Sequence, residues 1–186
     1  IGRMLEIQHL AIPDVIRVTP RRIGDLRGWF SETYNEQRFA EAGIGIRFVQ
    51  DNQSYSARAG TIRGLHFQAP PFAQAKLVRV LRGSIFDVAV DLRRSSATYG
   101  RWIAETLTAS GGEQLLIPAG FAHGFCTLEA DTEVLYKVDS HYAPTHDLGL
   151  CWNDPALGIA WPVGPDAALL SDKDRRVAPP AARPAP

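Results

Sequence analysis

Residues 76–92 read KLVRVLRGSIFDVAVDL, two apolar runs separated by Arg82 and Gly83. Side chains of a β-strand point alternately to opposite faces of its sheet. In the second run, positions 86, 88, 90 and 92 therefore share one face, and positions 85, 87, 89 and 91 share the other. This alternation and the intervening glycine predict two strands joined by a tight turn.

Other stretches carry the same strand signal. Strands are predicted at residues 61–70, 114–117 and 132–139. A helix is predicted at residues 35–42, where Asn35 is a suitable N-cap and Gly43 a stop, and a short helical turn is expected near residues 154–157. Many short strands with Gly and Pro turns indicate a sandwich or barrel. We expect an all-β jelly roll of two antiparallel sheets with a few short helices.

Length and composition describe one globular unit without a surface for polyanions. The chain has 186 residues, of which 45% are hydrophobic, enough for one domain with its own core. Its 20 Lys and Arg residues balance its 20 Asp and Glu residues, so no basic excess favours binding to nucleic acid or to a membrane. We expect one domain over residues 1–176 and a disordered tail, rich in Pro and Ala, over residues 177–186.

Cysteine usage and hydropathy indicate a cytoplasmic protein. Cys126 and Cys151 have no CxxC spacing and are typical of reduced thiols. We find no apolar run near the about 20 residues of a membrane span, and no signal-peptide pattern. Because Met4 is the only methionine, we expect the native protein to start there.

The strand predicted at residues 61–70, TIRGLHFQAP, is rich in polar groups. Arg63, His66 and Gln68 are followed by Lys76, in or beside the same apolar hairpin. Burial of so many polar groups without partners costs several kcal/mol, so a ligand site explains them better than a core does. Arg63 and His66 fall on opposite faces of a regular strand, so either a bulge at Gly64 turns both inward or one of the two lies outside the site.

The alternatives for His66 are a core histidine, a metal ligand and a catalytic base. Residues 118–123, PAGFAH, resemble the PxGxxH half-motif of the cupin superfamily, whose metal-binding members also carry an HxH pair. Here the corresponding positions read His66-Phe67-Gln68. A transition metal needs three or four ligands, and only His66 and His123 are suitably placed, so we expect no metal.

A longer resemblance runs from about residue 12 to residue 174. Its blocks, in chain order, are GDLRGWFSETYN (24–35), FVQDNQS (48–54), IRGLHFQ (62–68), AKLVRVLRGSIFDVAVDLRRSS (75–96), IPAGFAHGF (117–125), LYKVDSHYAP (135–144), WNDPALGIAWP (152–162) and LSDKD (170–174). This ordered set resembles the dTDP-4-dehydrorhamnose 3,5-epimerase family. The resemblance implies a cupin-type jelly roll, no cofactor, and a homodimer with an exchanged N-terminal segment.

The implied reaction is epimerisation at C3 and C5 of dTDP-4-dehydro-6-deoxy-D-glucose, which gives dTDP-4-dehydro-L-rhamnose in dTDP-L-rhamnose biosynthesis. The 4-keto group acidifies the protons at both carbons. Each inversion needs a base, an acid on the opposite face and a stabiliser for the enolate oxygen. His66 resembles the family's base. From the residues alone its orienting carboxylate stays open among Asp87, Asp91 and Asp174, and the resemblance implies Asp174.

The resemblance also implies the remaining roles. Tyr136 resembles the acid, and Lys76 the enolate stabiliser. The residues implied to bind substrate are Arg27, Arg63 and Lys173 for the diphosphate, Gln50, Asn52 and Glu32 for the nucleotide or sugar, Tyr142 for stacking on thymine, and His123 for the sugar pocket. Asp147 stands where family members have a glutamate one methylene longer, which affects the detail of nucleoside recognition.

Three other functions remain open at this stage. A single-centre epimerase, acting at C3 or C5 in a deoxysugar tailoring pathway, shares nearly all of the blocks. A metal-dependent cupin oxygenase needs the HxH pair that is absent at His66-Phe67-Gln68. A catalytically inactive sugar-nucleotide binder has no use for a paired base and acid.

Overall fold

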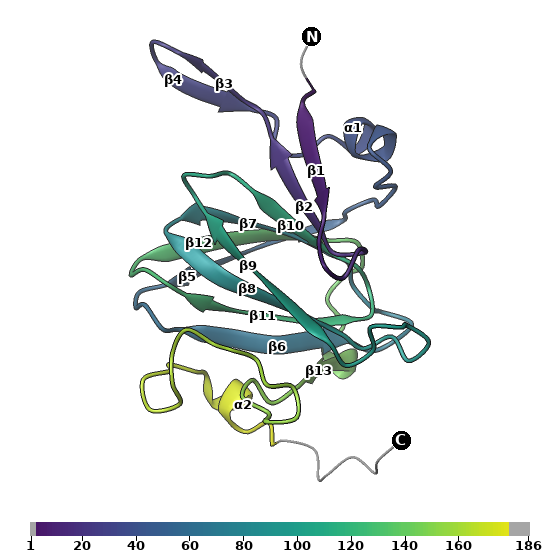
Figure 1. Cartoon of the computed structure of the whole chain (residues 1–186), viewed down its shortest axis with the longest axis vertical. Helices are drawn as coiled ribbons and strands as arrows, with labels where there is room; N and C mark the ends of the chain where they lie inside the picture. The colour runs from purple at the N-terminus through teal and green to yellow at the C-terminus, as the bar shows by residue number, and fades with distance from the viewer. Residues whose placement is uncertain (1–2, 179–186) are drawn as a thin grey trace.

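The computed structural model describes residues 3–178, which form two antiparallel β-sheets packed face to face (Figure 1). The six-stranded sheet has the order β1 (Leu5–His9), β2 (Ile16–Pro20), β10 (Gln114–Ile117), β7 (Lys76–Arg82), β12 (Thr132–Val138) and β5 (Gln50–Ser56). The five-stranded sheet has the order β13 (Asp147–Gly149), β6 (Ile62–Gln68), β11 (Phe121–Thr127), β8 (Ser84–Asp91) and β9 (Trp102–Thr108). The predicted all-β architecture of two antiparallel sheets is confirmed.

The tight turn predicted at Arg82 and Gly83 carries the chain from one sheet to the other. β7 belongs to the six-stranded sheet and β8 to the five-stranded sheet, so the two strands do not pair. Gly83 has φ +80°, and a Cβ there would lie 2.4 Å from the hydroxyl of Thr132. The apolar hairpin expected around Arg63, His66, Gln68 and Lys76 is wrong for the same reason, because β6 and β7 also lie in different sheets.

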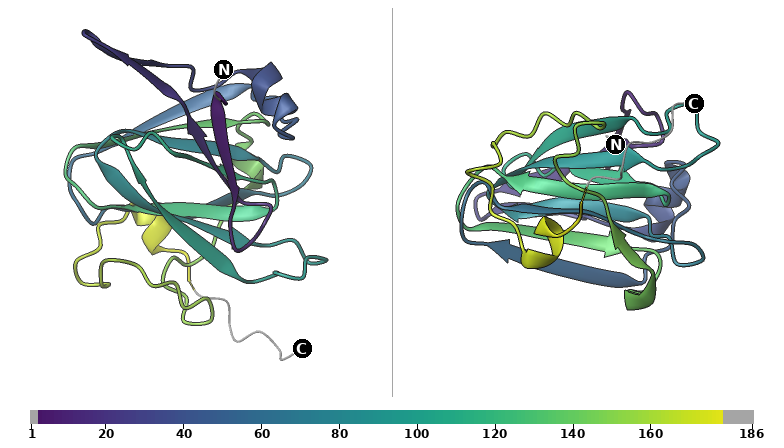
Figure 2. Two further views of the ribbon diagram at one scale, coloured as in Figure 1. Left: turned by 45° about the horizontal axis from the view of Figure 1, so that its top comes forward. Right: turned by 90° about the horizontal axis from the view of Figure 1, so that it is seen from below.

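Both faces of β8 are buried. Ile85 and Ala89 pack between the two sheets with β7 and β12. Val88 and Val90 lie on the other face and pack under the C-terminal segment, residues 150–170, which crosses the five-stranded sheet (Figure 2). The alternation in the sequence therefore separates an intersheet core from an outer core. It also places the odd-numbered acidic residues of this strand between the sheets.

The helices are short and lie at the edges of the sheets. α1 (Glu36–Glu41) begins at the predicted N-cap, where the side chain of Asn35 accepts a hydrogen bond from the Arg38 amide at 3.1 Å. The short helical turn expected near residues 154–157 is present as a single turn, in which the Asp154 carbonyl accepts hydrogen bonds from the amides of Leu157 at 3.0 Å and Gly158 at 3.2 Å. The other helices are the 3₁₀ helix η1 (Pro144–His146) and α2 (Asp172–Arg175), neither of which was predicted.

A separate hairpin of β3 (Arg22–Asp25) and β4 (Gly28–Ser31) projects from the sheets at the upper end of Figure 1. Its side chains include exposed Trp29 and Phe30. Among residues 3–178, no helix is long and apolar enough to span a membrane. The tail prediction covers residues 177–186, and residues 179–186 lie outside the described part of the chain.

Candidate active site

A cavity of about 400 Å³ lies between the two sheets, closed on one side by the C-terminal segment. Both sheets and the region around α2 contribute its polar lining. Seven of the predicted site residues line it: Arg63, His66, Lys76, His123, Tyr136, Lys173 and Asp174. The cavity therefore collects residues that are more than 100 positions apart in the sequence.

The predicted bulge at Gly64 is confirmed and brings Arg63 and His66 to the same cavity. His66 pairs with His123 on β11, but Arg63 pairs with Phe125, so two residues of β6 lie opposite the single residue Gly124. Gly64 has φ +125°, and a Cβ there would lie 2.6 Å from the Cα of Gly124. Glycine is therefore required at the point where the strand changes its facing.

His66 and Asp174 form a hydrogen-bonded pair. The Nε2 of His66 lies 2.5 Å from Oδ1 of Asp174, while Oδ2 accepts a hydrogen bond from the Gly64 amide at 3.1 Å. Burial acts to raise the pKa of Asp174, but its contacts with His66, Gly64 and Lys173 lower the pKa overall. An ionised carboxylate only accepts hydrogen bonds, so we assign the proton to Nε2 and leave Nδ1 of His66 as the free acceptor.

Asp174 is positioned by the first turn of α2. The Ser171 side chain caps this helix by accepting a hydrogen bond from the Asp174 amide at 3.1 Å. The chain before the helix is held beside β6, since Leu169 and Ile62 share a backbone hydrogen bond. The helix that follows the C-terminal segment thus places the Asp174 carboxylate in contact with His66.

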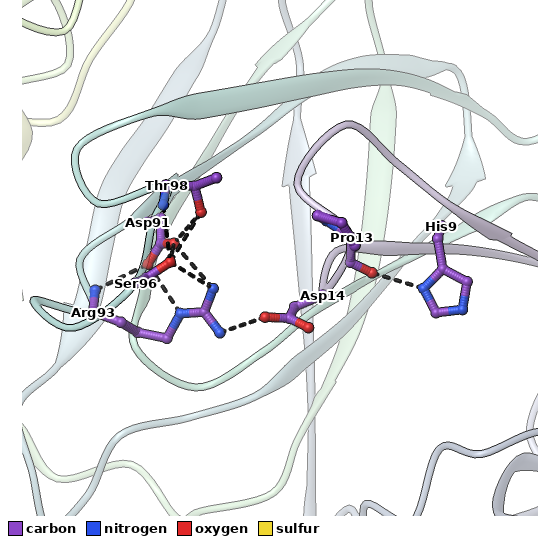
Figure 3. Close-up of polar contacts among 7 residues, drawn as sticks. All are labelled: His9, Pro13, Asp14, Asp91, Arg93, Ser96 and Thr98. Atoms are coloured by element: carbon purple, nitrogen blue, oxygen red, sulfur yellow. Dashed lines mark hydrogen bonds and ion pairs between the residues drawn. The ribbon is translucent and has the colours of Figure 1, made fainter.

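The other two candidate carboxylates serve different partners. Asp87 lies 2.6 Å from Nε2 of His123, and both residues are buried. Asp91 accepts hydrogen bonds from the backbone and guanidinium of Arg93 and from the hydroxyls of Ser96 and Thr98 (Figure 3). Of the three carboxylates left open by the sequence, Asp174 is the one that contacts His66.

Lys76 and Tyr136 lie next to each other in the cavity. The Nζ of Lys76 is 5.8 Å from the centre of the Tyr136 ring. Burial lowers the pKa of Lys76 to about 8, and the negative charges of Asp87 and Asp147 only partly oppose this effect. Burial raises the pKa of Tyr136, so its hydroxyl keeps its proton throughout the neutral range. A cation and a proton donor therefore face the same space.

A second polar cluster leads out of the cavity. Asp147 accepts hydrogen bonds from Lys173 and from the hydroxyl of Tyr142, so its shorter side chain does reach both neighbours. The backbone amide of Tyr142 donates a hydrogen bond to Oε1 of Gln50 at 3.1 Å. The side-chain Nε2 of Gln50 donates a hydrogen bond to Oδ1 of Asn52 at 2.9 Å. The Tyr142 ring is exposed beside this cluster.

Arg27 and Glu32 lie apart from the other predicted residues within this chain. Arg27 stands at the tip of the β3–β4 hairpin, with its side chain 90% exposed and paired to Asp25. Glu32 binds Arg38 at 2.7 Å and Asn35 at 3.1 Å. Neither residue lines the cavity.

Gln68 and Asp87 are buried polar residues whose partners the sequence did not predict. The amide of buried Gln68 bonds the backbone of Phe72, His141 and Ala143, and so holds the loop that carries Tyr142. A polar residue inside an apolar strand was the signal in each case. Within residues 3–178, no three His, Cys, Asp or Glu side chains are grouped so as to hold a metal ion.

The chain is similar to known proteins of one family. A family model described as dTDP-4-dehydrorhamnose 3,5-epimerase matches residues 9–181. The dTDP-4-dehydrorhamnose 3,5-epimerase of Pseudomonas aeruginosa is 54% identical over 173 residues, 92% of this chain and 94% of that protein. The dTDP-4-dehydrorhamnose 3-epimerase of Streptomyces niveus is 39% identical over 172 residues, 92% of this chain and 82% of that protein.

A solved structure of the same family has a similar fold. The crystal structure of dTDP-4-dehydrorhamnose 3,5-epimerase from Bacillus anthracis, with TDP and PPi bound, matches with a TM-score of 0.91 and 50% sequence identity. The match covers 94% of this chain and 99% of that one. The chain therefore belongs to the dTDP-4-dehydrorhamnose 3,5-epimerase family.

Proposed function

We propose that this protein is an isomerase that inverts C3 and C5 of dTDP-4-dehydro-6-deoxy-D-glucose and so forms dTDP-4-dehydro-L-rhamnose for dTDP-L-rhamnose biosynthesis. The observation that carries the proposal is the hydrogen-bonded pair of His66 and Asp174, which faces a buried lysine and a buried tyrosine in one cavity. The family to which the chain belongs supports the choice of substrate.

His66 is the base in this proposal. Its Nδ1 removes the proton from C3 or C5, and the C–H electron pair moves into the C–C bond toward C4 while the carbonyl oxygen takes up the negative charge. Asp174 holds the ring in the required tautomer and stabilises the imidazolium that forms. The reaction consumes no redox equivalent, so the protein needs no cofactor.

Lys76 and Tyr136 complete the cycle. The Lys76 ammonium stabilises the enolate oxygen, an interaction that is stronger in a dry cavity than in water. Tyr136 then donates its proton to the face of the carbon opposite His66, which inverts the centre. The raised pKa of the phenol keeps it protonated until the enolate forms.

The nucleotide diphosphate lies along the polar cluster outside the sugar cavity. Arg63 and Lys173 bind the phosphate oxygens, since both cations line the exit of the cavity. Tyr142 stacks on thymine, beside the carboxylate of Asp147. Gln50 and Asn52 bind the nucleotide or sugar through their side-chain amides. His123 accepts a hydrogen bond from a hydroxyl of the sugar.

We propose a cytoplasmic homodimer in which each copy completes the other's site with its exchanged N-terminal segment. The β3–β4 hairpin supports this, because it exposes Trp29 and Phe30 together with Arg27. Exposed aromatic side chains on a projecting hairpin are typical of surfaces that contact a partner. In such a dimer Arg27 and Glu32 act in the partner's site.

Proton NMR of the substrate in heavy water tests the proposed function. Deuterium at both C3 and C5 and formation of the L-rhamno product are the expected results. Deuterium at a single carbon establishes a single-centre epimerase instead, the activity named for the Streptomyces niveus relative. Exchange at neither carbon contradicts the proposal.

A further inference from the structure

Asp87 is a buried carboxylate with one oxygen that has no hydrogen-bond partner among residues 3–178. Its side chain is 0% exposed, and Oδ1 accepts a hydrogen bond from Nε2 of His123 at 2.6 Å. Oδ2 is buried and has no hydrogen-bond partner among the described residues. Buried polar atoms are nearly always paired, so an unpaired carboxylate oxygen beside a cavity calls for a physical reason.

His123 does not balance the charge of Asp87. Burial lowers the pKa of His123, an effect that the nearby carboxylate only partly offsets. The ring is therefore neutral at neutral pH. Because the carboxylate can only accept, Nε2 carries the proton, and Nδ1 is left as a hydrogen-bond acceptor on a ring that lines the cavity.

Lys76 is a buried cation that lines the same cavity as His123. The Lys76 ammonium and the His123 ring both lie beside Tyr136, with the Nζ of Lys76 5.8 Å and the centre of the His123 ring 6.4 Å from the centre of the Tyr136 ring. The described part of the chain gives this ammonium no ion pair within 4.0 Å, yet it is buried. Burial lowers the pKa of Lys76, and the negative charge of Asp87 opposes this effect.

The other titratable groups around Lys76 come from every neighbouring element. They are Arg63 and His66 on β6, His123 on β11, Tyr136 on β12, Asp147 on β13, and Lys173 and Asp174 on α2. Asp147 already contacts Lys173 and Tyr142, and Asp174 contacts His66. Within residues 3–178, Asp87 has no Lys or Arg side-chain nitrogen within 4.0 Å of its carboxylate oxygens, and its hydrogen-bonded partner is His123.

We propose that Asp87 is a positioning residue for the enolate-binding end of the cavity. One oxygen fixes the ring of His123, and the charge of the carboxylate keeps Lys76 an ammonium. With this arrangement His123 presents an acceptor nitrogen to a sugar hydroxyl, while Lys76 presents a positive charge to the neighbouring carbonyl oxygen. The inference rests on the proposed function of Lys76 and extends it to a residue that touches no substrate atom.

The test is the pH profile of kcat/KM for Asp87→Asn, measured on the full chain. Loss of the negative charge makes protonated Lys76 less favourable, so the alkaline limb should move to lower pH by about one unit or more. An unchanged limb with activity reduced equally at all pH values would overturn the proposal. Asp91→Asn is the matched control, because Asp91 is equally buried on the same strand but bonded to Arg93. Its limb should stay at the wild-type pH.

A second measurement uses the wild-type protein, in case Asp87→Asn does not fold. Nitrogen-15 NMR of the histidine rings should show His123 neutral, with its proton on Nε2, from about pH 7 to 9. A positively charged His123 over this range would overturn the proposal, because His123 and not Lys76 would then balance Asp87. This reading is independent of turnover. It therefore separates failure of the present inference from failure of the proposed function.

Discussion

The two acidic residues on the inner face of β8 have opposite surroundings. Asp91 is surrounded by donors, which include the Arg93 guanidinium and two hydroxyls (Figure 3). Asp87, four residues earlier, has one donor and a second oxygen without any. A strand can thus carry one carboxylate whose contacts are complete and serve the fold, and another left incomplete beside a cavity.

The same contrast holds for the regions around them. The Arg93 cluster ties the loop after β8 to Asp14 in the loop between β1 and β2. Polar groups in the cavity, by comparison, face open space of about 400 Å³. Substitutions in the cavity should therefore change the reaction more than the stability, and substitutions in the Arg93 cluster should do the reverse. Substitutions in the two regions therefore test this contrast.

Asp174→Asn should have the largest effect. An asparagine in place of the carboxylate no longer stabilises the imidazolium and favours the wrong tautomer of His66, so kcat should fall by about 10³-fold or more. Single-turnover kinetics with dTDP-4-dehydro-6-deoxy-D-glucose measures this loss. Nearly wild-type kcat would remove Asp174 from the mechanism, whereas an unaltered Kd for TDP would show that the cavity is still formed.

Tyr136→Phe should separate the two proton transfers. The variant keeps the base and loses the acid, so completed epimerisation should slow by about 10²-fold while the first exchange of solvent deuterium slows less. Comparing the rate of deuterium incorporation with the rate of product formation measures the difference. Equal losses in both rates would assign Tyr136 to the first step as well.

The alkaline limb of activity should report Lys76. The protonated form is the active one, and its pKa is lowered to about 8 by burial, so kcat/KM should fall about tenfold per pH unit above that value. Lys76→Arg keeps the charge at all accessible pH values, and its limb should disappear even though its maximum rate is lower. A limb that stays in place in Lys76→Arg would belong to another group.

Asp91→Asn should have the smallest effect on the reaction and a clear effect on the fold. Removing the buried carboxylate leaves Arg93 paired with the exposed Asp14 and takes the charged acceptor away from Ser96 and Thr98, so the free energy of unfolding should fall by about 2–4 kcal/mol while kcat stays within about twofold. Urea denaturation monitored by tryptophan fluorescence measures it. Asp14→Asn, which removes the exposed partner of the same arginine, should cost less than about 1 kcal/mol.

The pH dependence of stability should follow the same carboxylate. Burial acts to raise the pKa of Asp91, but hydrogen bonds from Arg93, Ser96 and Thr98 lower it overall. A group with a lowered pKa in the folded state stabilises the protein above its unfolded pKa of about 3.9 and loses this contribution as the pH falls. The free energy of unfolding, measured by urea denaturation at a series of acidic pH values, should therefore fall less steeply with decreasing pH in Asp91→Asn than in wild type.

Local pattern predicted the strands but not their partners. Alternation at residues 84–92 gave the two faces correctly, and the bulge at Gly64 followed from the need to turn Arg63 and His66 together. Alternation says nothing of which strand lies alongside, so the assignment of β7 and β8 to different sheets came only with the structure.

The site was predictable to the extent that its residues stand out locally. His66 and Lys76 are conspicuous polar groups in apolar strands. Asp174 lies 108 residues from His66, and only the family resemblance selected it over Asp87. The functional assignments of these residues remain predictions, as does the role of Arg27, which the single chain leaves far from the cavity.

The most direct test of the account is deuterium exchange at C3 and C5 by His66→Asn in heavy water, followed by proton NMR. Asparagine is a smaller polar side chain that cannot act as the base. We therefore predict no exchange at either carbon over the time in which wild type exchanges both, while binding of TDP is retained. Exchange at the wild-type rate by this variant would contradict the account, because the proton would then be removed by a group other than His66.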